Sequence, residues 1–296
     1  MRPGRGYRYP MARVTVVGSV NMDLFFEVAQ LPEPGQTVLA SASHSEPGGK
    51  GANQAVAAAR AGAQVQLVAA IGADAPGDAL RKHLRDNGVG LDGVALLPVP
   101  SGTAAITVSA GAENMIVVAP GANAHLTLDS ALARQIVADC DVLLVQLEIP
   151  VATALAAARC AQAAGVTVLV NASPTGADPA LLAELAAVTD VVIVNETEAD
   201  QWCWPVAHLV ITRGAEGAVH RSAAGESHIA APAVEAADST GAGDVFAGVL
   251  ASGWASDPHR ALRRAVTAGA LATLVRGAGN CAPLDEAIED AIRTPN

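Results

Sequence analysis

The sequence predicts an α/β protein with a mostly parallel sheet covered by helices on both faces, together with a small second sheet. From about residue 125 onward, helical and strand patterns alternate, which is typical of a parallel sheet. Hydrophobic residues make up 51% of the chain and aromatic residues only 3%, so the core must consist largely of Ala, Val and Leu. Two other segments, about 24–47 and 99–119, show short alternating runs that predict the small sheet.

The first 120 residues contain both kinds of pattern. Residues 13–20 (RVTVVGSV) read as a buried strand. The segment after it contains three prolines and no helical period, which predicts irregular antiparallel structure that leaves the main sheet. The remaining elements predicted here are a helix over 51–63, a strand over 64–72, a helix that starts near Asp74 and ends before Gly88, and a hairpin over 101–119 with its turn at 111–114.

The rest of the chain repeats the order of helix followed by strand. The predicted elements are a helix over 127–139, a strand over 141–148, a helix over 151–164, a strand over 166–174, a helix over 178–187, strands over 190–198 and 208–214, a strand pair over 217–221 and 226–230, and helices over 243–254, 258–275 and 284–293.

Composition narrows the class of protein. The 296 residues are enough for one large α/β domain, predicted over 11–296, with residues 1–10 as a disordered extension. A net charge of −11 argues against broad binding to nucleic acid or to anionic membranes. The four cysteines form no CxxC or zinc pattern, and neither a signal peptide nor a membrane span is evident. A cytoplasmic protein is therefore expected.

Polar clusters occur where the predicted parallel strands end. Ligands of open α/β sheets bind beyond the carboxyl ends of the strands, so these clusters are expected to meet there. A single turn Asn or capping Asp is more often structural, but seven clusters at one edge favour a binding site. They contain Asn21 and Asp23; Gly48, Gly49, Lys50 and Asn53; Glu148; Asn171; Asn195 and Glu198; Arg213 and Gly214; and the stretch 238–244.

The stretch GGKGAN differs from a Walker A motif, which requires four residues between its glycines and a hydroxyl residue after the lysine. The glycine pair would let the backbone approach a small polar ligand, to which Lys50 and Asn53 could hydrogen-bond. A glycine turn that leads into a capped helix is the structural alternative.

The stretch DSTGAGD predicts an anion site with a base beside it. Gly241, Ala242 and Gly243 place bare N–H groups at the start of a helix, where free donors and the helix dipole favour an anion. Asp244 in the first helical turn could accept a proton from an attacking hydroxyl. This combination suggests phosphoryl transfer. The alternative is a helix whose first-turn Asp only complements the dipole.

The stretch NETEAD places three acids around Asn195. They could form a solvated face, or Glu198 could orient Mg²⁺ through water beside a nucleotide.

Together these motifs resemble the PfkB carbohydrate-kinase family, and the GGKGANQ segment is similar to its ribokinase branch. GSVNMD, LPEPGQTV, GGKGANQAVAAARAGA, VQLE, NETEA, TRGAEGA and DSTGAGDVFAG occur in that order over residues 18–248. The resemblance implies a three-layer αβα fold with a β-sheet lid over about 24–47 and 99–119, which often pairs two subunits into a homodimer. It also implies ATP-dependent phosphorylation of a sugar hydroxyl, with D-ribose at O5 as the leading substrate.

The resemblance also implies roles for individual residues. Asp244 would be the base, and Gly241, Ala242 and Gly243 the anion hole. The matching sugar-binding residues are Asn21, Asp23, Gly49, Lys50, Asn53, Glu148 and Asp244. The matching nucleotide-binding residues are Asn195, Thr212, Arg213, Gly214, Gly217 and Gly243, and Glu198 matches the magnesium-associated acid. A K⁺ ion would be held, mostly through backbone oxygens, by Asp238, Thr240, Ala272, Val275, Gly277 and Cys281.

The chain departs from the family pattern in two places. Ser239 replaces the usual threonine, and only QWCWPVA separates NETEAD from HLVITRG, where relatives carry a full helix. Two tryptophans and a cysteine would then cover the exposed apolar surface, unless another subunit does. The sequence leaves open a kinase for another sugar, polyol or nucleoside, although aromatic platforms for a base are scarce and Phe25 and Phe26 are the nearest candidates. A non-catalytic sensor of sugar or nucleotide is the alternative of a different class.

Overall fold

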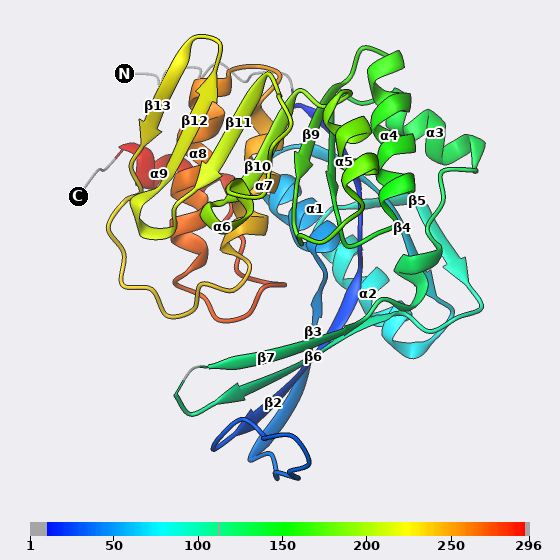
Figure 1. Cartoon of the computed structure of the whole chain (residues 1–296), viewed down its shortest axis with the longest axis vertical. Helices are drawn as coiled ribbons and strands as arrows, with labels where there is room; N and C mark the ends of the chain where they lie inside the picture. The colour runs from blue at the N-terminus through cyan, green and yellow to red at the C-terminus, as the bar shows by residue number, and fades with distance from the viewer. Residues whose placement is uncertain (1–10, 112, 294–296) are drawn as a thin grey trace, which may run out of the picture.

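The computed structural model describes residues 11–111 and 113–293 and contains two sheets (Figure 1). The larger sheet has the strand order β13-β12-β11-β10-β9-β8-β1-β4-β5, and the smaller one the order β3-β2-β6-β7. The strands are β1 (Arg13–Val17), β2 (Asn21–Val28), β3 (Ala42–Gly48), β4 (Gln64–Gly72), β5 (Gly90–Leu97), β6 (Gly102–Ser109), β7 (Asn114–Ala119), β8 (Val142–Gln146), β9 (Thr167–Asn171), β10 (Val191–Asn195), β11 (His208–Thr212), β12 (Ala218–Ser222) and β13 (Gly225–Ile229).

The seven strands from β11 to β5 pair in parallel, and β12 and β13 add an antiparallel edge. The helices are α1 (Lys50–Arg60), α2 (Ala75–Asp86), α3 (Ala131–Ala138), α4 (Val151–Ala163), α5 (Pro179–Ala186), α6 (Glu196–Ala199), α7 (Ala242–Gly253), α8 (Pro258–Ala272) and α9 (Asp285–Arg293), with 3₁₀ turns η1 (Gly121–His125) and η2 (Gly214–Glu216).

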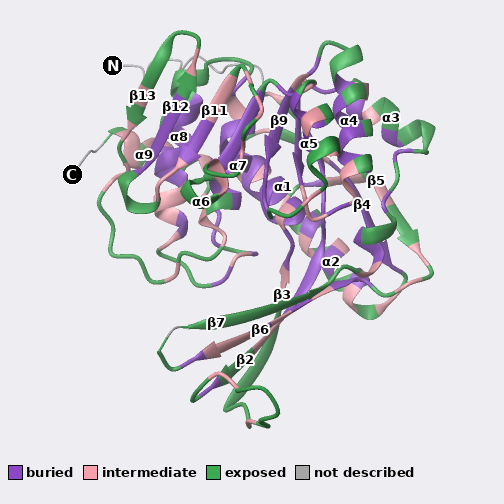
Figure 2. Ribbon diagram, viewed as in Figure 1, coloured by how far each residue is buried: buried purple, intermediate pink, exposed green. Residues whose placement is uncertain are grey.

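The main sheet separates two apolar cores, because successive side chains of a strand point to opposite faces. On β1, for example, Val16 packs in the core that contains residues of α1, α2, α7, α8 and α9, whereas Val17 packs in the core that contains residues of α3, α4 and α5. Figure 2 shows buried strands between these two helix layers. The predicted three-layer α/β arrangement with a second small sheet is therefore confirmed.

Most predicted elements are present, but several boundaries differ and one strand was missed; for example, the helix predicted over 258–275 ends at Ala272. The strand predicted over 190–198 ends at Asn195, because that residue caps the short helix α6. The helix predicted over 127–139 starts only at Ala131, after Ser130 as its N-cap. The strand predicted over 166–174 ends at Asn171. The edge strand β5 was not predicted, because its half-exposed residues, including Gly90 and Gly93, show no regular alternation. The predicted extension 1–10 lies outside the described residues.

In the short segment after α6, two tryptophans pack on the sheet. Trp202 and Trp204 are half-buried against the core formed with α3, α4 and α5, and their rings meet edge to face at 5.1 Å. The Trp202 indole N–H donates to the Trp204 carbonyl at 2.9 Å. Cys203 between them is exposed. The tryptophans thus cover this part of the sheet, as predicted, whereas the cysteine does not contribute.

The small sheet projects from the body of the molecule at the edge where the parallel strands end (Figure 1). Its strand β2 follows β1 after only three residues, and β3 leads directly into α1. Residues at the base of this sheet are therefore held close to the ends of β1 and β8.

Candidate active site

Close backbone packing places the two helices that carry the site. The start of α1 lies against the end of β1, where a Cβ on Gly51 would come within 2.6 Å of the carbonyl carbon of Gly18. Helix α7 packs against α1 at Gly248, where a Cβ would overlap the carbonyl oxygen of Gln54. Only glycine permits these approaches. Because Asp244 lies one helical turn before Gly248, its side chain comes to lie beside α1.

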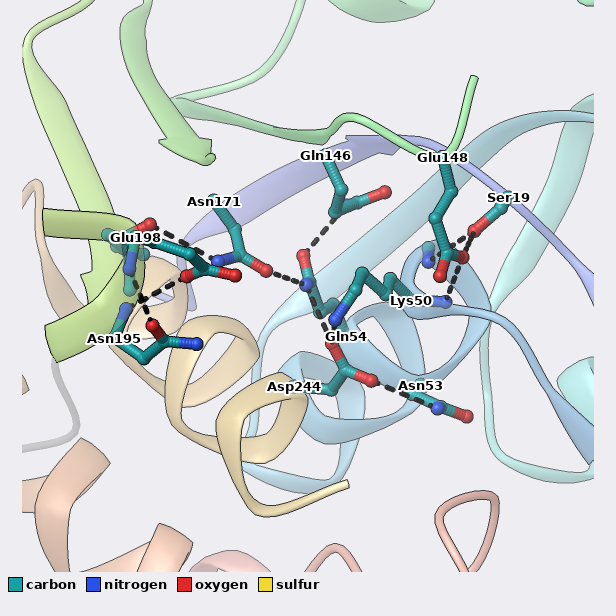
Figure 3. Close-up of polar contacts among 12 residues, drawn as sticks. Ser19, Lys50, Asn53, Gln54, Gln146, Glu148, Asn171, Asn195, Glu198 and Asp244 are labelled. Atoms are coloured by element: carbon teal, nitrogen blue, oxygen red, sulfur yellow. Dashed lines mark hydrogen bonds and ion pairs between the residues drawn. The ribbon is translucent and has the colours of Figure 1, made fainter. Parts of the chain in front are cut away.

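Asp244 is the centre of the site (Figure 3). The residue is only 7% exposed. Its Oδ2 accepts a hydrogen bond from Asn53 Nδ2 at 3.1 Å, and its Oδ1 accepts one from Gln54 Nε2 at 2.9 Å. The ammonium of Lys50 lies 4.0 Å from Oδ1. Two hydrogen-bond donors and one cation therefore converge on this buried side chain, and an aspartate placed in this way can act as a general base.

Lys50 stands between the acids of the site. The carboxylate of Asp244 raises the pKa of Lys50, against the opposing effect of burial, and Glu148 adds to the increase. The neighbouring carboxylates therefore favour the ammonium form of Lys50. The carboxylate of Glu148 accepts the Lys50 backbone N–H at 3.1 Å and the Ser19 hydroxyl at 2.5 Å, which anchors the start of α1 to the end of β8.

Asn21 and Asp23 reach the site from the first residues of β2. The carbonyl of the Asn21 side chain accepts from Asn123 Nδ2 at 2.8 Å, and Asn123 also pairs with the Val20 backbone. Asp23 lies over Gly48, where a Cβ would overlap its carboxylate. Burial, followed by the negative charge of Glu148, Asp244 and Glu46, raises the pKa of Asp23 to about 7. Asp23 therefore titrates near neutral pH.

Gly49 brings the backbone of the α1 N-terminus to this cluster. Its φ of 88° lies in the left-handed region, and a Cβ there would come within 2.7 Å of the Asn21 backbone nitrogen. The predicted set of sugar-binding residues, Asn21, Asp23, Gly49, Lys50, Asn53 and Glu148, is thus gathered around Asp244.

A second group of predicted residues lies at the ends of β10 and β11, whose last residues Asn195 and Thr212 pair in register. Asn195 and Glu198 form a reciprocal capping box on α6, in which each side chain accepts the other's backbone N–H at 2.8 Å. This cap occupies one oxygen of Glu198. The Thr212 hydroxyl donates to the Val194 carbonyl at 3.3 Å.

The turn after β11 contains Arg213, Gly214 and Gly217. Both glycines have a positive φ, 53° and 94°, and Gly217 also packs against β13 where no Cβ would fit. Arg213 is bonded to Glu196 at 2.9 Å and Glu216 at 3.0 Å, and these acids raise the pKa of its guanidinium. Arg213 therefore shapes the turn through ion pairs.

The loop before α7 is joined to the loop after α8 by Asp238. Its carboxylate accepts the Thr240 N–H at 2.9 Å and the Gly277 N–H at 3.0 Å. Cys281 packs on Gly241, with its Sγ 3.8 Å from the Thr240 carbonyl. Burial and the charge of Asp244 raise the pKa of the Cys281 thiol to about 11, so it remains protonated. Ala272 ends α8 and its carbonyl accepts the Val275 N–H at 3.1 Å.

The stretch that precedes Asp244 forms the start of α7. Gly241 is the N-cap with a φ of 80°, which a residue with a Cβ rarely adopts. Ala242 and Gly243 occupy the first turn, and the space beside Gly243 is open for at least 4 Å from the position of a Cβ. This leaves room for a ligand beside Gly243. The prediction of three bare N–H groups needs correction, because the Ala242 N–H donates to the Ser239 carbonyl at 3.3 Å.

Sequence reasoning missed three residues that contact the site. Gln54 and Gln146 are fully buried and linked to Asp244, and Ser19 holds Glu148. Asn171 was recognised as a polar residue at a strand end, but its bond to Gln54 was not predicted. The signal in the sequence for the three missed residues was their place in the quoted motifs: Gln54 follows Asn53 in GGKGANQ, Gln146 lies in VQLE and Ser19 lies in GSVNMD.

None of the helices in the described part of the chain combines the length and the apolar character that a bilayer crossing requires.

Comparison with known proteins places this arrangement in a family. A model described as pfkB family carbohydrate kinase matches residues 11–285. The chain is 36% identical to a ribokinase of Bacillus subtilis (strain 168) over 298 residues, covering 95% of this chain and 100% of that protein. It is 30% identical to a deoxyribokinase of Salmonella typhi, covering 91% and 95% of the two chains.

Solved structures agree with the sequence relatives. The structure of Arabidopsis thaliana ribokinase complexed with ribose and ATP superimposes with a TM-score of 0.89 at 26% identity, covering 96% of this chain and 100% of that one. A Methanocaldococcus jannaschii nucleoside kinase, at 18% identity and a TM-score of 0.85, shares the fold. With its family model matched over nearly the whole length and its relatives covered almost completely, the chain belongs to the pfkB family of carbohydrate kinases, which are phosphotransferases with an alcohol group as acceptor.

Proposed function

We propose that the protein transfers the γ-phosphoryl group of ATP to a hydroxyl of D-ribose and forms D-ribose 5-phosphate. The observation that carries this proposal is the buried carboxylate of Asp244, which lies at the start of α7 and among the side chains of Lys50 and Asn53. The similarity to two proteins named ribokinase supports ribose as the acceptor.

In the proposed reaction, Asp244 takes the proton of the acceptor hydroxyl as the hydroxyl oxygen attacks the γ-phosphorus. The bond from phosphorus to the β–γ bridging oxygen breaks, and its electron pair leaves with ADP. We assign the negative charge of the moving group to the N–H groups of Gly241, Ala242 and Gly243 at the N-terminus of α7, where the Ala242 N–H would exchange the Ser239 carbonyl for a phosphoryl oxygen. Asn21, Asp23, Gly49, Lys50, Asn53 and Glu148 orient the sugar through its other hydroxyls.

We assign ATP to the residues at the ends of β10 and β11 and the turn that follows. These are Asn195, Thr212, Arg213, Gly214 and Gly217, together with Gly243 at the anion site. Glu198 would hold Mg²⁺ through water, since one carboxylate oxygen remains outside its capping bond and hard cations prefer oxygen ligands. The ion would supply charge neutralisation on the phosphates.

We also propose a K⁺ site between the loop before α7 and the loop after α8. The Asp238 carboxylate accepts hydrogen bonds from the backbone N–H groups of Thr240 and Gly277 and so holds the two loops together. Oxygen atoms of this carboxylate and of the nearby backbone would be the ligands of the ion. The carbonyls of Ala272 and Val275 and the backbone of Cys281 complete the proposed set. A cation at this position would neutralise charge and stabilise the loop that carries the anion hole.

The small sheet of β2, β3, β6 and β7 would act as a lid of the single domain 11–296, because β2 and β3 lead into the sugar-binding residues. We propose that two lids pair in a homodimer. All six residues of the edge strand β7 are exposed, among them Ile116 at 53% and Val117 at 65% (Figure 2). An exposed apolar edge strand invites pairing with another chain.

The four cysteines are free thiols, which supports a reducing, cytoplasmic location.

The dimer is tested by the Val117→Lys substitution. We expect a shift from dimer to monomer in sedimentation velocity, because a lysine at the centre of an apolar edge opposes burial. Wild-type protein that sediments as a monomer at micromolar concentration would contradict the proposal.

Sugar affinity is expected to rise with pH up to about pH 7. The carboxyl of Asp23, whose pKa is raised to about 7 by burial and neighbouring acids, is protonated below that pH and becomes a stronger acceptor for sugar hydroxyls above it. The same raised pKa means that the native state binds an extra proton, so the free energy of unfolding falls as pH rises from the ordinary aspartate pKa toward 7. Calorimetric titration with ribose across this range measures the affinity, and Asp23→Asn should remove its pH dependence.

The substrate is tested by measuring ADP release with ribose, deoxyribose, fructose, ribitol and nucleosides, each with and without K⁺. We expect the largest kcat/KM for ribose, with K⁺ activation. The similarity to a deoxyribokinase makes deoxyribose the second candidate. A higher kcat/KM for any other acceptor would replace ribose, and tight binding of ribose and ATP without phosphorylated product would identify a non-catalytic sensor.

A further inference from the structure

A chain of buried amides leads to Asp244 from the sheet. The Gln146 side chain donates Nε2–H to Gln54 Oε1 at 2.7 Å. Gln54 Nε2 in turn donates to Asp244 Oδ1 at 2.9 Å and to Asn171 Oδ1 at 3.0 Å. Figure 3 shows this chain between the strand ends and the carboxylate. Gln54 and Gln146 are both 0% exposed, so their amides exchange no hydrogen bonds with bulk water.

The orientation of the Gln54 amide is determined by two oxygen atoms that can only accept hydrogen bonds, one on Asn171 and one on Asp244. Asn171 Nδ2 donates to the backbone carbonyl of Ile193 at 3.2 Å, which leaves Asn171 Oδ1 to face Gln54. The carboxylate of Asp244 also requires a donor. Gln54 must therefore present both N–H groups to these two oxygens, because a flipped amide would place its oxygen against them. Both of its donors and its carbonyl are used, so the side chain has one orientation.

Gln146 completes the chain at a cost. Its Nε2 must face Gln54 Oε1, and its own Oε1 is then a buried oxygen without a hydrogen-bond partner. That oxygen lies over Gly18, where any Cβ would overlap it. An unsatisfied buried acceptor destabilises a fold. In this position the Gln146 amide opposes rotation of the Gln54 amide, because a rotated Gln54 would turn its N–H groups toward Gln146 Nε2.

We propose that Gln54 is a positioning residue for phosphoryl transfer, which orients the carboxylate of Asp244 toward the acceptor hydroxyl and is itself held by Gln146 and Asn171. The proposal rests on the role of Asp244 as base given above. Asn53 donates to the other carboxylate oxygen at 3.1 Å, so that two donors from adjacent residues of α1 define the plane of the carboxylate. Asn53 is assigned to the sugar, whereas Gln54 points away from it into the network, which makes Gln54 the support of the base.

The test is the Gln54→Met variant, which keeps the length of the side chain and removes every hydrogen bond. We expect kcat to fall about 10- to 100-fold, the scale of a small misplacement of a reacting group, while the KM values for ribose and ATP change less than about threefold. Turnover is calculated per binding-competent site, which ribose calorimetry counts, so loss of folded protein does not lower the value. A purely structural role would lower the melting temperature and the number of sites without this loss of kcat.

Gln66→Met is the matched control. Gln66 also donates to an aspartate, Asp92, at 3.1 Å and also has a buried carbonyl oxygen without a partner, but it lies in the first part of β4, away from the strand ends that form the site. We expect its kcat to equal that of the wild type.

Gln146→Met provides a second test if Gln54→Met fails to fold, because Gln54 then stays in place but loses the group that prevents its rotation. We expect a smaller decrease in kcat, about three- to tenfold, with unchanged KM values. If Gln54→Met folds and keeps the wild-type kcat, the proposal is wrong. If Gln54→Met does not fold, a wild-type kcat in Gln146→Met overturns the proposal instead. If both the glutamine variant and Asp244→Asn retain turnover, the assignment of Asp244 as the base is wrong as well. If the glutamine variant is active and Asp244→Asn is not, Asp244 remains the base and only the role of Gln54 is rejected.

Discussion

Replacement of Asp244 by asparagine is expected to lower kcat by about 10²- to 10⁴-fold, the contribution of a general base. An amide cannot accept the proton of the acceptor hydroxyl at neutral pH. The same change also disturbs the buried contacts, because Asn53 Nδ2 and Gln54 Nε2 both donate to the native carboxylate. An asparagine offers one acceptor oxygen, and its NH₂ group would face the other donor.

Initial-rate measurements of ADP release with saturating ribose, ATP, Mg²⁺ and K⁺ check this expectation. Asp139→Asn is the matched control, since Asp139 is an exposed acid at the opposite end of β8 that pairs with Arg13 at 2.9 Å. Exposed ion pairs contribute little to stability, so its activity and stability should be those of the wild type. If Asp244→Asn keeps its kcat within about threefold of wild type, Asp244 is not the base.

Gly248→Ala is expected to reduce both stability and turnover. A Cβ at this position overlaps the Gln54 carbonyl oxygen and lies 2.8 Å from the Ala57 Cβ, so helices α1 and α7 must separate. Overpacking of this kind costs about 1 to 3 kcal/mol of the free energy of unfolding. Because Asp244 and Gln54 lie on the two separated helices, we also expect kcat to fall by at least about tenfold.

Urea denaturation and initial rates measure the two effects, with Gly269→Ala as the control. Gly269 lies within α8, where a Cβ would be 3.4 Å from the Ala242 oxygen and 3.7 Å from the Phe246 Cβ, which are ordinary contacts. Alanine is the better helix former, so the control should be as stable as wild type or up to about 1 kcal/mol more stable. If Gly248→Ala is as stable as the wild type, the added Cβ does not force α1 and α7 apart, and the prediction is wrong.

The predicted site residues lie at one edge of the main sheet because of a property of parallel sheets. Asn21, Glu148, Asn195 and Thr212 follow or end different strands, and the carboxyl ends of parallel strands share one edge. The sequence alone could therefore group these residues before any contact was known. Their roles toward sugar, nucleotide and cations remain predictions.

Local patterns were less reliable where a side chain competes with the backbone. The strand predicted over 190–198 stops at Asn195 because the capping box with Glu198 satisfies backbone donors that a longer strand would have paired. Strand β5 escaped prediction because an edge strand with glycines has no continuous buried face.

The sequence by itself determined the α/β class, the order of most elements and the edge of the sheet at which the polar residues meet, since these follow from hydrophobic periodicity and from motifs that are local in the chain. Only the tertiary structure decided how Asp244 is held. Its contacts with Asn53 and Gln54 join residues 191 and 190 positions apart, and Gln146 is 92 positions from Gln54. No periodicity records such a contact, because it exists only when Gly18, Gly51 and Gly248 let a strand and two helices approach at backbone distance.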